Sequence, residues 1–321
     1  MDLIYTDVRR KDVGVLRDYT LDLAFGSDEN DFALTLDLNN HCCEPGCLIY
    51  AEGTEYGGII DGLGVVTAED KLTYVGRTWH GILAMKIIEP NEGEAYLKVS
   101  GEANAVIGEM LHRLGVTDLI VASKENSGLM VDSYSFDRYI DGYSGIKKML
   151  ESVSAKPKFT FVEDKVILSA IPIVDYSEDE QFDNDTVEMQ FESTNAVNHL
   201  ICLGKGELEN RLVVHLYVDA DGNVGTTQSF FGIQEITVVY DYPNAESEEE
   251  MVKDAVKKLE EEYAKVNQLQ LDFTADDDTY DVGDIVAARE IVTGIVATAK
   301  ISKKIVTINK GEVTIQYKVG E

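Results

Sequence analysis

The sequence is short of basic residues. Of its 321 residues only 28 are lysine or arginine, against 59 aspartate and glutamate, so the formal net charge is −31. A surface with this excess repels the phosphates of nucleic acids and anionic lipids, because binding to either depends on lysine and arginine. We therefore expect neither stable nucleic-acid binding nor attachment to an anionic membrane surface.

Long hydrophobic runs are missing as well. No segment approaches the roughly 18 consecutive apolar residues that a membrane-spanning helix needs. The first residues, Met-Asp-Leu-Ile-Tyr, have neither the basic start nor the apolar stretch of a secretory signal peptide. The sequence predicts no membrane anchor and no secretion by a signal peptide.

Cysteine is scarce and unsuited to a disulfide framework. Cys42, Cys43 and Cys47 are crowded together, and Cys202 stands apart. With His41 the cluster could ligate zinc, but zinc sites normally pair two separated cysteine knuckles, and no second one follows. A strand-entering turn that holds small apolar cysteines is the alternative, and we predict no metal site.

Catalytic motifs are also absent. The five histidines lie in unrelated contexts, and no nucleophile elbow, zinc-protease helix or phosphate-binding loop appears. The segment 219–223 resembles the start of a calcium loop, but Phe230 stands where the closing glutamate belongs, so a hairpin turn is the other interpretation. The acidic segment 276–281 could hold a cation or be a solvated loop. We predict no enzyme, no catalytic residues and no cofactor.

Two stretches far apart in the chain share one β pattern. The first is Pro45-Gly46-Cys47-Leu48-Ile49 followed after a gap by Gly58-Ile59-Ile60; the second is Val282-Gly283-Asp284-Ile285-Val286 followed by Gly294-Ile295-Val296. Each runs into a further hairpin, at 64–75 and 304–319. A β unit used twice favours a part that builds rings or tubes over an enzyme, although similar glycine-punctuated hairpins also arise by chance.

The periodicity of the chain predicts an α+β, β-rich fold with two similar β-barrel-like modules. Residues 1–93 form the first β module, and 94–186 form an α+β module with helices over 101–114 and 144–154. Residues 187–235 and 270–321 form the second β module. The amphipathic segment 236–269, with its long helix, is inserted into it.

The only tryptophan lies in the run from Gly76 to Leu83, next to an arginine. Trp79 and Arg77 are candidate interface residues, because these two residue types dominate binding hot spots. The alternative is that Trp79 closes the core of the first β module.

Several of these residues together resemble one protein family. The runs Gly57-Gly58-Ile59-Ile60-Asp61, Tyr74-Val75-Gly76-Arg77-Thr78-Trp79-His80-Gly81-Ile82-Leu83 and Ser100-Gly101-Glu102-Ala103 are similar to tail proteins of siphophages and prophages from Gram-positive hosts. The closing run Tyr280-Asp281-Val282-Gly283-Asp284-Ile285-Val286 resembles the same family and the wider late-control-protein-D and baseplate-hub class. The motifs are turns and strands, so they indicate a fold and no chemistry.

The resemblance implies a phage tail hub fold and a homotrimeric ring that joins the tail tube to the baseplate or tip. Two similar barrels per chain, taken three times, would match a sixfold tube. The implied partners are further copies of the chain, the tail tube or distal tail protein, and tail-tip or fibre proteins. The implied location is the virion tail, after assembly in the host cytoplasm.

The acidic composition fits a ring through which DNA passes, because carboxylates on the lumen wall would keep the duplex from adhering. An acidic outer surface that serves solubility is the alternative. The alternative function is a tail-tip protein that binds or hydrolyses host cell-wall carbohydrate.

Overall fold

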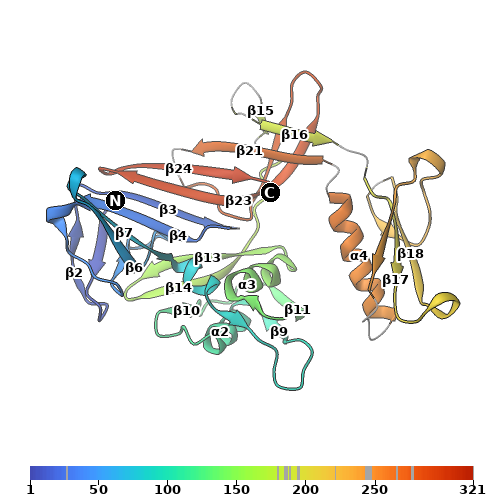
Figure 1. The fold of residues 1–321 in the computed structure, drawn as a ribbon, viewed down its shortest axis with the longest axis horizontal. Helices are drawn as coiled ribbons and strands as arrows, with labels where there is room; N and C mark the ends of the chain where they lie inside the picture. The colour runs from blue at the N-terminus through green and yellow to red at the C-terminus, as the bar shows by residue number, and fades with distance from the viewer. Residues whose placement is uncertain are drawn as a thin grey trace. The chain divides into compact units, whose positions relative to one another are not determined.

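The computed structural model describes residues 1–26, 28–178, 181–183, 187, 189–193, 196–220, 222–242, 248–264, 267–275 and 278–320. They form two compact units (Figure 1). The first contains Met1–Glu188, Leu271–Arg289 and Thr298–Glu321, and the second contains Met189–Gln270 and Glu290–Ala297.

This grouping differs from the four segments that the sequence predicts. Residues 1–93, 94–186 and most of 270–321 lie together in the first unit, whereas 189–235 and the long helix lie in the second. The division into four segments therefore stays a prediction, because the two compact units do not coincide with these segments.

A large and mostly antiparallel sheet dominates the first unit. Its strands follow the order β21-β24-β23-β3-β4-β7-β6-β5-β1-β2, with β22 pairing to β23 and β15 to β22. The bounds are β1 (Leu3–Thr6), β2 (Asp12–Leu16), β3 (Thr20–Gly26), β4 (Asp31–Asp37), β5 (Leu48–Tyr50), β6 (Gly57–Val66), β7 (Lys71–Thr78), β15 (Gln181–Asp183), β21 (Asn267–Ala275), β22 (Ile285–Arg289), β23 (Val296–Asn309) and β24 (Glu312–Val319).

The two ends of the chain meet within this sheet. Strand β3 pairs antiparallel with β23, from Gly26 opposite Lys303 to Thr20 opposite Asn309. The free edge of β3 is thus hydrogen-bonded to β23, and one continuous sheet includes strands of the first β module and of the C-terminal segment 270–321. The β-rich α+β class is confirmed, but the barrel-like shape needs correction: among the described strands neither module closes into a barrel.

An α+β layer lies beside this sheet in the first unit. Its strands are β8 (Ile87–Ile88), β9 (Lys98–Glu102), β10 (Ile120–Ala122), β11 (Met130–Ser135), β12 (Ile140–Asp141), β13 (Ala155–Val162) and β14 (Lys165–Pro172), and its helices are α1 (Trp79–Ala84), α2 (Ala103–Arg113) and α3 (Gly142–Glu151). β14 lies between β13, which is antiparallel to it, and β10, which is parallel.

Both predicted helices of this layer are present. The Glu102 side chain accepts the amide of Ala105 at the start of α2, and Gly115 ends that helix with a φ of 68°. Helix α3 begins two residues before the predicted Ser144, because the Asp141 carboxylate accepts the Ser144 amide at 2.9 Å and caps the helix.

One hydrophobic core joins the first β module to this layer. The Trp79 and Tyr50 rings stack on Phe161 of β13, with centroids 5.6 and 3.9 Å apart. The buried faces of α2 and α3 belong to the same cluster. Residues 1–93 and 94–186 therefore fold against each other and share their stabilisation.

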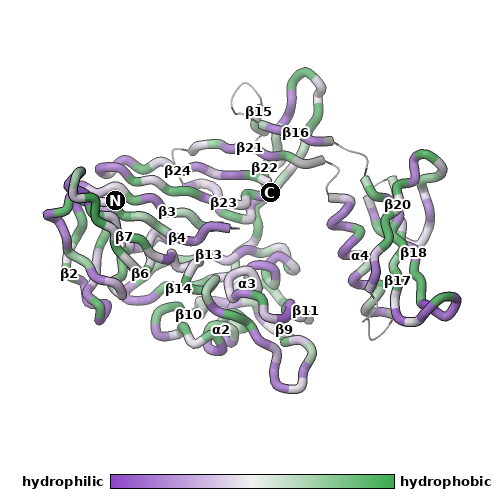
Figure 2. Tube along the Cα trace, viewed as in Figure 1, coloured by the Kyte–Doolittle hydropathy of each residue, from purple (hydrophilic) through white to green (hydrophobic). Residues whose placement is uncertain are grey.

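The second unit contains a small sheet covered on one face by a helix. Its elements are β16 (Met189–Ser193), β17 (His199–Leu203), β18 (Val213–Val218), β19 (Val224–Gly225), β20 (Thr237–Asp241) and α4 (Glu248–Ala264), and four of the strands follow the order β19-β18-β17-β20. The tubes of β17 and β18 are mostly hydrophobic in Figure 2, and α4 carries a mixture. The core comprises Leu200, Cys202, Leu216, Val218, Met251, Ala255 and Leu259. None of the helices in the described residues is long and apolar enough to cross a membrane.

Candidate functional site

A four-strand unit occurs twice in the large sheet. In the N-terminal copy the strands lie in the order β5-β6-β7-β4, and in the C-terminal copy they lie in the order β22-β23-β24-β21. In each copy the first strand along the chain lies beside the last one, and both of these pairs are antiparallel. The copies therefore share their topology as well as their sequence pattern.

The turn that precedes β5 in the N-terminal copy is the same as the turn that precedes β22 in the C-terminal copy. It spans 44–47 in one copy and 281–284 in the other, and in each the fourth residue donates its amide to the carbonyl of the first at 3.1 Å. Gly46 and Gly283 occupy the third position with φ of 99° and 100°. A positive φ at this position is the requirement of a type II turn, which explains the glycine in both copies.

The partner of the turn in the next strand is equivalent too. Ile60 exchanges backbone hydrogen bonds of 2.8 and 2.9 Å with Gly46 and Cys47, and Ile301 exchanges two of 2.8 Å with Gly283 and Asp284. A β-bulge follows at once in both strands. The repeat in the sequence pattern predicts that 58–60 corresponds to 294–296. The residue equivalent to Ile60 is instead Ile301, because the hairpin formed by β22 and β23 extends further beyond the paired residues than the hairpin formed by β5 and β6.

A tyrosine on the last strand fixes the approach to each turn. The Tyr74 hydroxyl accepts the backbone amides of Cys42 and Cys43 at 3.1 and 3.0 Å, and the Tyr317 hydroxyl donates to the carbonyl of Tyr280 at 3.0 Å. Cys43 and Tyr280 both directly precede the turn. The two tyrosines thus perform the same task in equivalent places.

The side chains of the two copies nevertheless differ sharply in charge. Lys304 lies opposite Tyr317 and its side chain is fully buried, whereas Leu63, which lies opposite Tyr74, is 43% exposed. The turns differ in the same way, since the side chain that caps the first amide is the Cys47 thiol in one copy and the Asp284 carboxylate in the other.

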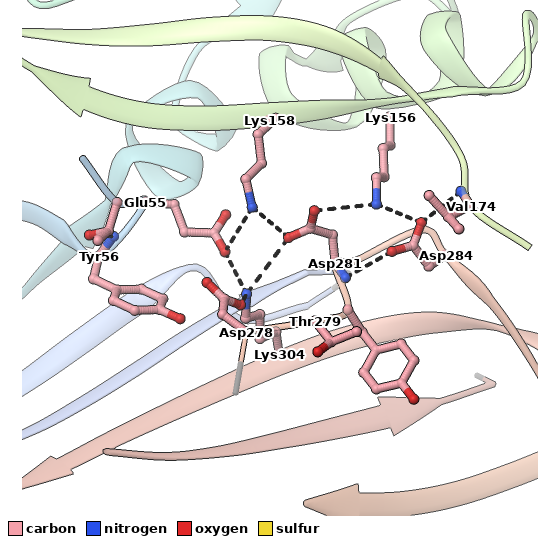
Figure 3. Close-up of polar contacts among 12 residues, drawn as sticks. Glu55, Tyr56, Lys156, Lys158, Val174, Asp278, Thr279, Asp281, Asp284 and Lys304 are labelled. Carbon is pink, nitrogen blue, oxygen red and sulfur yellow. Dashed lines mark hydrogen bonds and ion pairs between the residues drawn. The ribbon is translucent and has the colours of Figure 1, made fainter. Parts of the chain in front are cut away.

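Three lysines and four carboxylates of the first unit form a partly buried ion-pair network around the C-terminal copy (Figure 3). Lys156 Nζ lies 2.5 Å from Asp284 Oδ1 and 3.3 Å from Asp281 Oδ2. Lys158 Nζ lies 2.6 Å from Asp281 Oδ1. Because both lysines project from β13, they tie the α+β layer to the C-terminal turn.

Lys304 connects the same network to the N-terminal β module. Its Nζ lies 2.8 Å from Glu55 Oε1, 3.7 Å from Asp281 Oδ1, and also contacts Asp278. The ammonium also lies over the ring of Tyr56, 5.6 Å from the centroid. The network therefore joins the three parts of the first unit: both β modules and the layer between them.

The pKa values follow from this pairing. Burial by itself would lower the pKa of Lys304, but the nearby carboxylates, Glu55 above all, outweigh it and raise the pKa. Burial would raise the pKa of Asp281, and the Lys158 and Lys156 ammoniums hold it below its usual value. His80 lies among aromatic rings next to this network, and burial, with the charges of Lys304 and Lys158, lowers its pKa to about 3.

Carboxylates of this network could in principle ligate a cation. Oxygens of Glu55, Asp278 and Asp281 lie within 4.8 Å of one another, and they form the only such group of metal-ligating side chains in the described part of the chain. The lysine ammoniums already bind these oxygens, so the arrangement suits internal ion pairs. Asp276 and Asp277, from the predicted acidic loop, lie outside the described residues.

The other two candidate metal segments are built as turns. Asp219 accepts the backbone amide of Asn223 at 2.8 Å across a hairpin turn, and Asp221 is outside the described residues. Cys43 and Cys47 are buried, and Cys47 Sγ accepts the amide of Glu44. Asp219 and Cys47 thus each accept a backbone amide within their own turn.

The two candidate interface residues lie in different environments. Trp79 is 0% exposed within the shared core, as the core interpretation expects, and offers no surface to a partner in this conformation. Arg77 is partly exposed on β7 and forms a bidentate pair with Asp61, with two contacts of 2.7 Å. An interface role therefore stays a prediction, and it rests on Arg77.

Comparison with solved structures places this arrangement among known folds. The chain is similar to a tail protein from Neisseria meningitidis MC58 (TM-score 0.54, 12% identity, 100% of this chain and 96% of that one). It is also similar to the 43 kDa tail protein of prophage MuSo2 from Shewanella oneidensis (0.60, 8%, 99% and 98%) and to the prophage tail protein gp18 from Listeria monocytogenes EGD-e (0.57, 11%, 99% and 94%).

The chain has the fold of phage and prophage tail proteins. The likeness extends over nearly the full length of these proteins. No protein-family model and no curated protein matches the sequence.

Proposed function

We propose that this protein is a non-enzymatic structural subunit of a phage or prophage tail, in which three copies form a ring that joins the tail tube to the baseplate or tip. The observation that carries the proposal is the four-strand unit that occurs twice, with the same turn, bulge and tyrosine. Its setting in a fold shared with tail proteins supports the same role.

The duplication gives this ring its symmetry. A chain with two equivalent units presents two equivalent surfaces, so three chains present six in a closed ring. Six matches the sixfold tail tube that the family resemblance implies. The proposed partners are two further copies of the chain, the tube or distal tail protein on one side, and tip or fibre proteins on the other.

The ion-pair network would make each subunit rigid enough for this task. Seven charged groups from three parts of the first unit pair with one another, and four of them, Glu55, Lys156, Asp284 and Lys304, are buried. Separating the parts would leave these buried ions without partners. The two four-strand units are thereby held within one body.

Mass spectrometry of purified tail particles tests the proposal. We expect the chain in the particles at half the number of copies that one ring of a sixfold tube contains. Its absence from tails that contain the tube protein would contradict the proposal. Incubation of the purified protein with host cell walls tests the alternative, because release of soluble fragments above background would favour a hydrolytic tip protein.

The net charge makes ring formation dependent on salt. Subunits with a formal charge of −31 repel one another over long distances, and the screening length falls from roughly 30 Å at 0.01 M salt to about 8 Å at physiological ionic strength. Trimer formation should therefore strengthen over this range, as measured by sedimentation at several protein concentrations.

A further inference from the structure

A groove of about 650 Å³ crosses the exposed face of the large sheet, over β23, β3, β4, β7 and β6. Ala24, Ala33 and Val75 contribute to its floor, and Val75 is 46% exposed. Met85, at the end of α1, is 68% exposed at its rim. These are apolar side chains open to solvent on a sheet whose other face is buried.

Two carboxylates of this groove are not engaged in an ion pair with a described residue. Five acidic side chains line it, but Asp28 and Glu29 pair with Lys303, and Asp61 pairs with Arg77. Asp22 and Asp31 form no ion pair with any described residue. Partial burial, with the nearby Glu29 and Asp22, raises the pKa of Asp31 in spite of the opposing charge of Lys303. The groove therefore suits an occupant that brings an apolar side chain and two positive charges.

The turn between β1 and β2 of this same chain has that chemistry. Arg9-Arg10-Lys11 is the only run of three basic residues in the sequence. Arg9 and Lys11 are exposed and form no ion pair with any described residue, and Val8 beside them is 56% exposed. This tip thus presents two unpaired cations around an apolar side chain.

The same turn is held in one conformation. Asp7 Oδ1 accepts the backbone amides of Arg9 and Lys11 at 2.8 and 2.9 Å, and Arg10 adopts a φ of 64°. The Arg10 guanidinium contacts Asp118 Oδ2 at 2.7 Å, outside the groove of its own chain. A tip that is already ordered loses little entropy when it docks.

We propose that the turn 7–11 of one copy docks into the groove of a second copy, with Arg9 and Lys11 against Asp22 and Asp31 and Val8 on the apolar floor. The interface is heterologous, since a different surface is used on each partner, and repeated docking closes a ring if the rotation allows it. This inference rests on the proposed ring and identifies one contact that would build it.

Close pairs of this kind tolerate the salt that the ring requires. Oppositely charged groups in contact are screened less than carboxylates that repel each other across the ring. Raising the ionic strength to physiological values therefore removes more repulsion than attraction, and the docking is consistent with the salt dependence expected above.

The test uses two charge-reversal variants of the full chain, Arg9→Glu/Lys11→Glu in the turn and Asp22→Lys/Asp31→Lys in the groove. Sedimentation at physiological ionic strength should show each variant associating roughly a hundredfold or more weakly than the wild type, because like charges then face each other. Two control variants make the same change in net charge elsewhere: Lys205→Glu/Lys257→Glu, and Glu92→Lys/Asp132→Lys. The controls should assemble like the wild type, apart from the small effect of net charge.

Mixing the two reversal variants sharpens the result. Each variant's turn is complementary in charge to the other variant's groove and repels its own, so a mixture should associate more strongly than either variant alone. A chain with all four reversals should recover the ring. Circular dichroism shows whether every variant is folded. If a double variant is unfolded, the single Arg9→Ala variant provides the same test with a smaller expected loss of association.

Three results would overturn the docking: a wild type that stays monomeric, an assembly that neither reversal weakens, or a mixture that associates no more strongly than either variant alone. The tail function is judged separately, by the presence of the chain in tail particles. A ring that survives both reversals would leave the tail proposal standing and remove only this contact.

Discussion

The two copies of the four-strand unit share a backbone and differ in what they bury. Both have a glycine with φ near 100° at the third position of the turn, a bulge after the isoleucine that pairs with it, and a tyrosine that holds the preceding residue. In the C-terminal copy an aspartate and a lysine occupy the interior, and in the N-terminal copy the equivalent residues are a cysteine and an exposed leucine.

This difference separates two requirements on the sequence. Glycine and the bulge are needed wherever the turn is built, because the backbone conformation demands them. The charged side chains are needed only in the copy that meets Lys156 and Lys158 of β13. The repeat thus determines the backbone of both copies, and the ion pairs bind only the C-terminal copy to β13.

The largest effect should come from making the second copy resemble the first. Lys304→Leu leaves Glu55 and its neighbouring carboxylates without their buried cation, which costs about 3–5 kcal/mol of the free energy of unfolding. The reciprocal Leu63→Lys, at a half-exposed position, should change it by less than about 0.5 kcal/mol. Urea unfolding measures both. Equal effects would show that the two copies do not differ as described.

The next effect is a pH dependence that arises beside the C-terminal copy only. The pKa of His80 is about 3 in the folded protein and near 6.5 when unfolded, so the unfolded state takes up a proton first as the pH falls. Stability should therefore drop below pH 6.5, by about 2 kcal/mol at pH 5. Asp281 adds to the loss at lower pH, since its folded pKa is depressed and its stabilisation disappears as it is protonated.

His80→Phe should flatten the curve of unfolding free energy between pH 6.5 and 5. A phenyl ring can keep the stacking on Phe25, where the ring centroids lie 4.6 Å apart. His80 Nδ1 has no hydrogen-bond partner to lose among the described residues. The matched variant His112→Phe, on the exposed side of α2, should keep the wild-type slope. An unchanged slope in His80→Phe would contradict the assignment.

A smaller effect should be the same in both copies. Gly46→Ala and Gly283→Ala each force an L side chain into a left-handed backbone conformation and should each cost about 1–2 kcal/mol of stability. Gly64→Ala in β6, where φ is not positive and the space is open, should cost nothing. Thermal unfolding measures the three. A cost at only one of the two turns would mean that the turns are not equivalent.

The smallest effect concerns the tyrosines. Tyr74→Phe and Tyr317→Phe each remove one buried hydroxyl, at about 1 kcal/mol of unfolding free energy. Tyr74→Phe should be the larger loss, because two backbone amides lose their acceptor there and only one carbonyl loses its donor in the other copy. Urea unfolding of the two variants side by side checks the order.

Much of the backbone could be predicted from the sequence. The two turns are visible in Pro45-Gly46 and Val282-Gly283, because only glycine meets their φ. The helices α2 and α3 follow from apolar spacing. The sequence pattern misaligns the second half of the repeat, because Ile301 lies 18 positions after Gly283 while Ile60 lies 14 after Gly46, and a fixed spacing cannot allow for the longer strands of the C-terminal hairpin.

The ion-pair network could not be predicted in the same way. Lys156, Glu55 and Asp281 look like surface charges, and they meet across more than 100 positions of sequence through tertiary packing. The sequence contains one indication that Lys304 is buried, since it alternates in phase with the apolar Val306 and Ile308. The sequence also does not reveal that neither module closes into a barrel among the described strands, because strand periodicity does not tell which strand occupies the edge of β3.

Electron cryomicroscopy of purified tail particles tests the central claim most directly, because it shows the number of copies and the place of each four-strand unit. We expect three chains in a ring at the end of the tail tube, with their six four-strand units alternating around the axis at similar radius. A ring built from any other number of chains, or a ring in which only one of the two units faces the tube, would contradict the account.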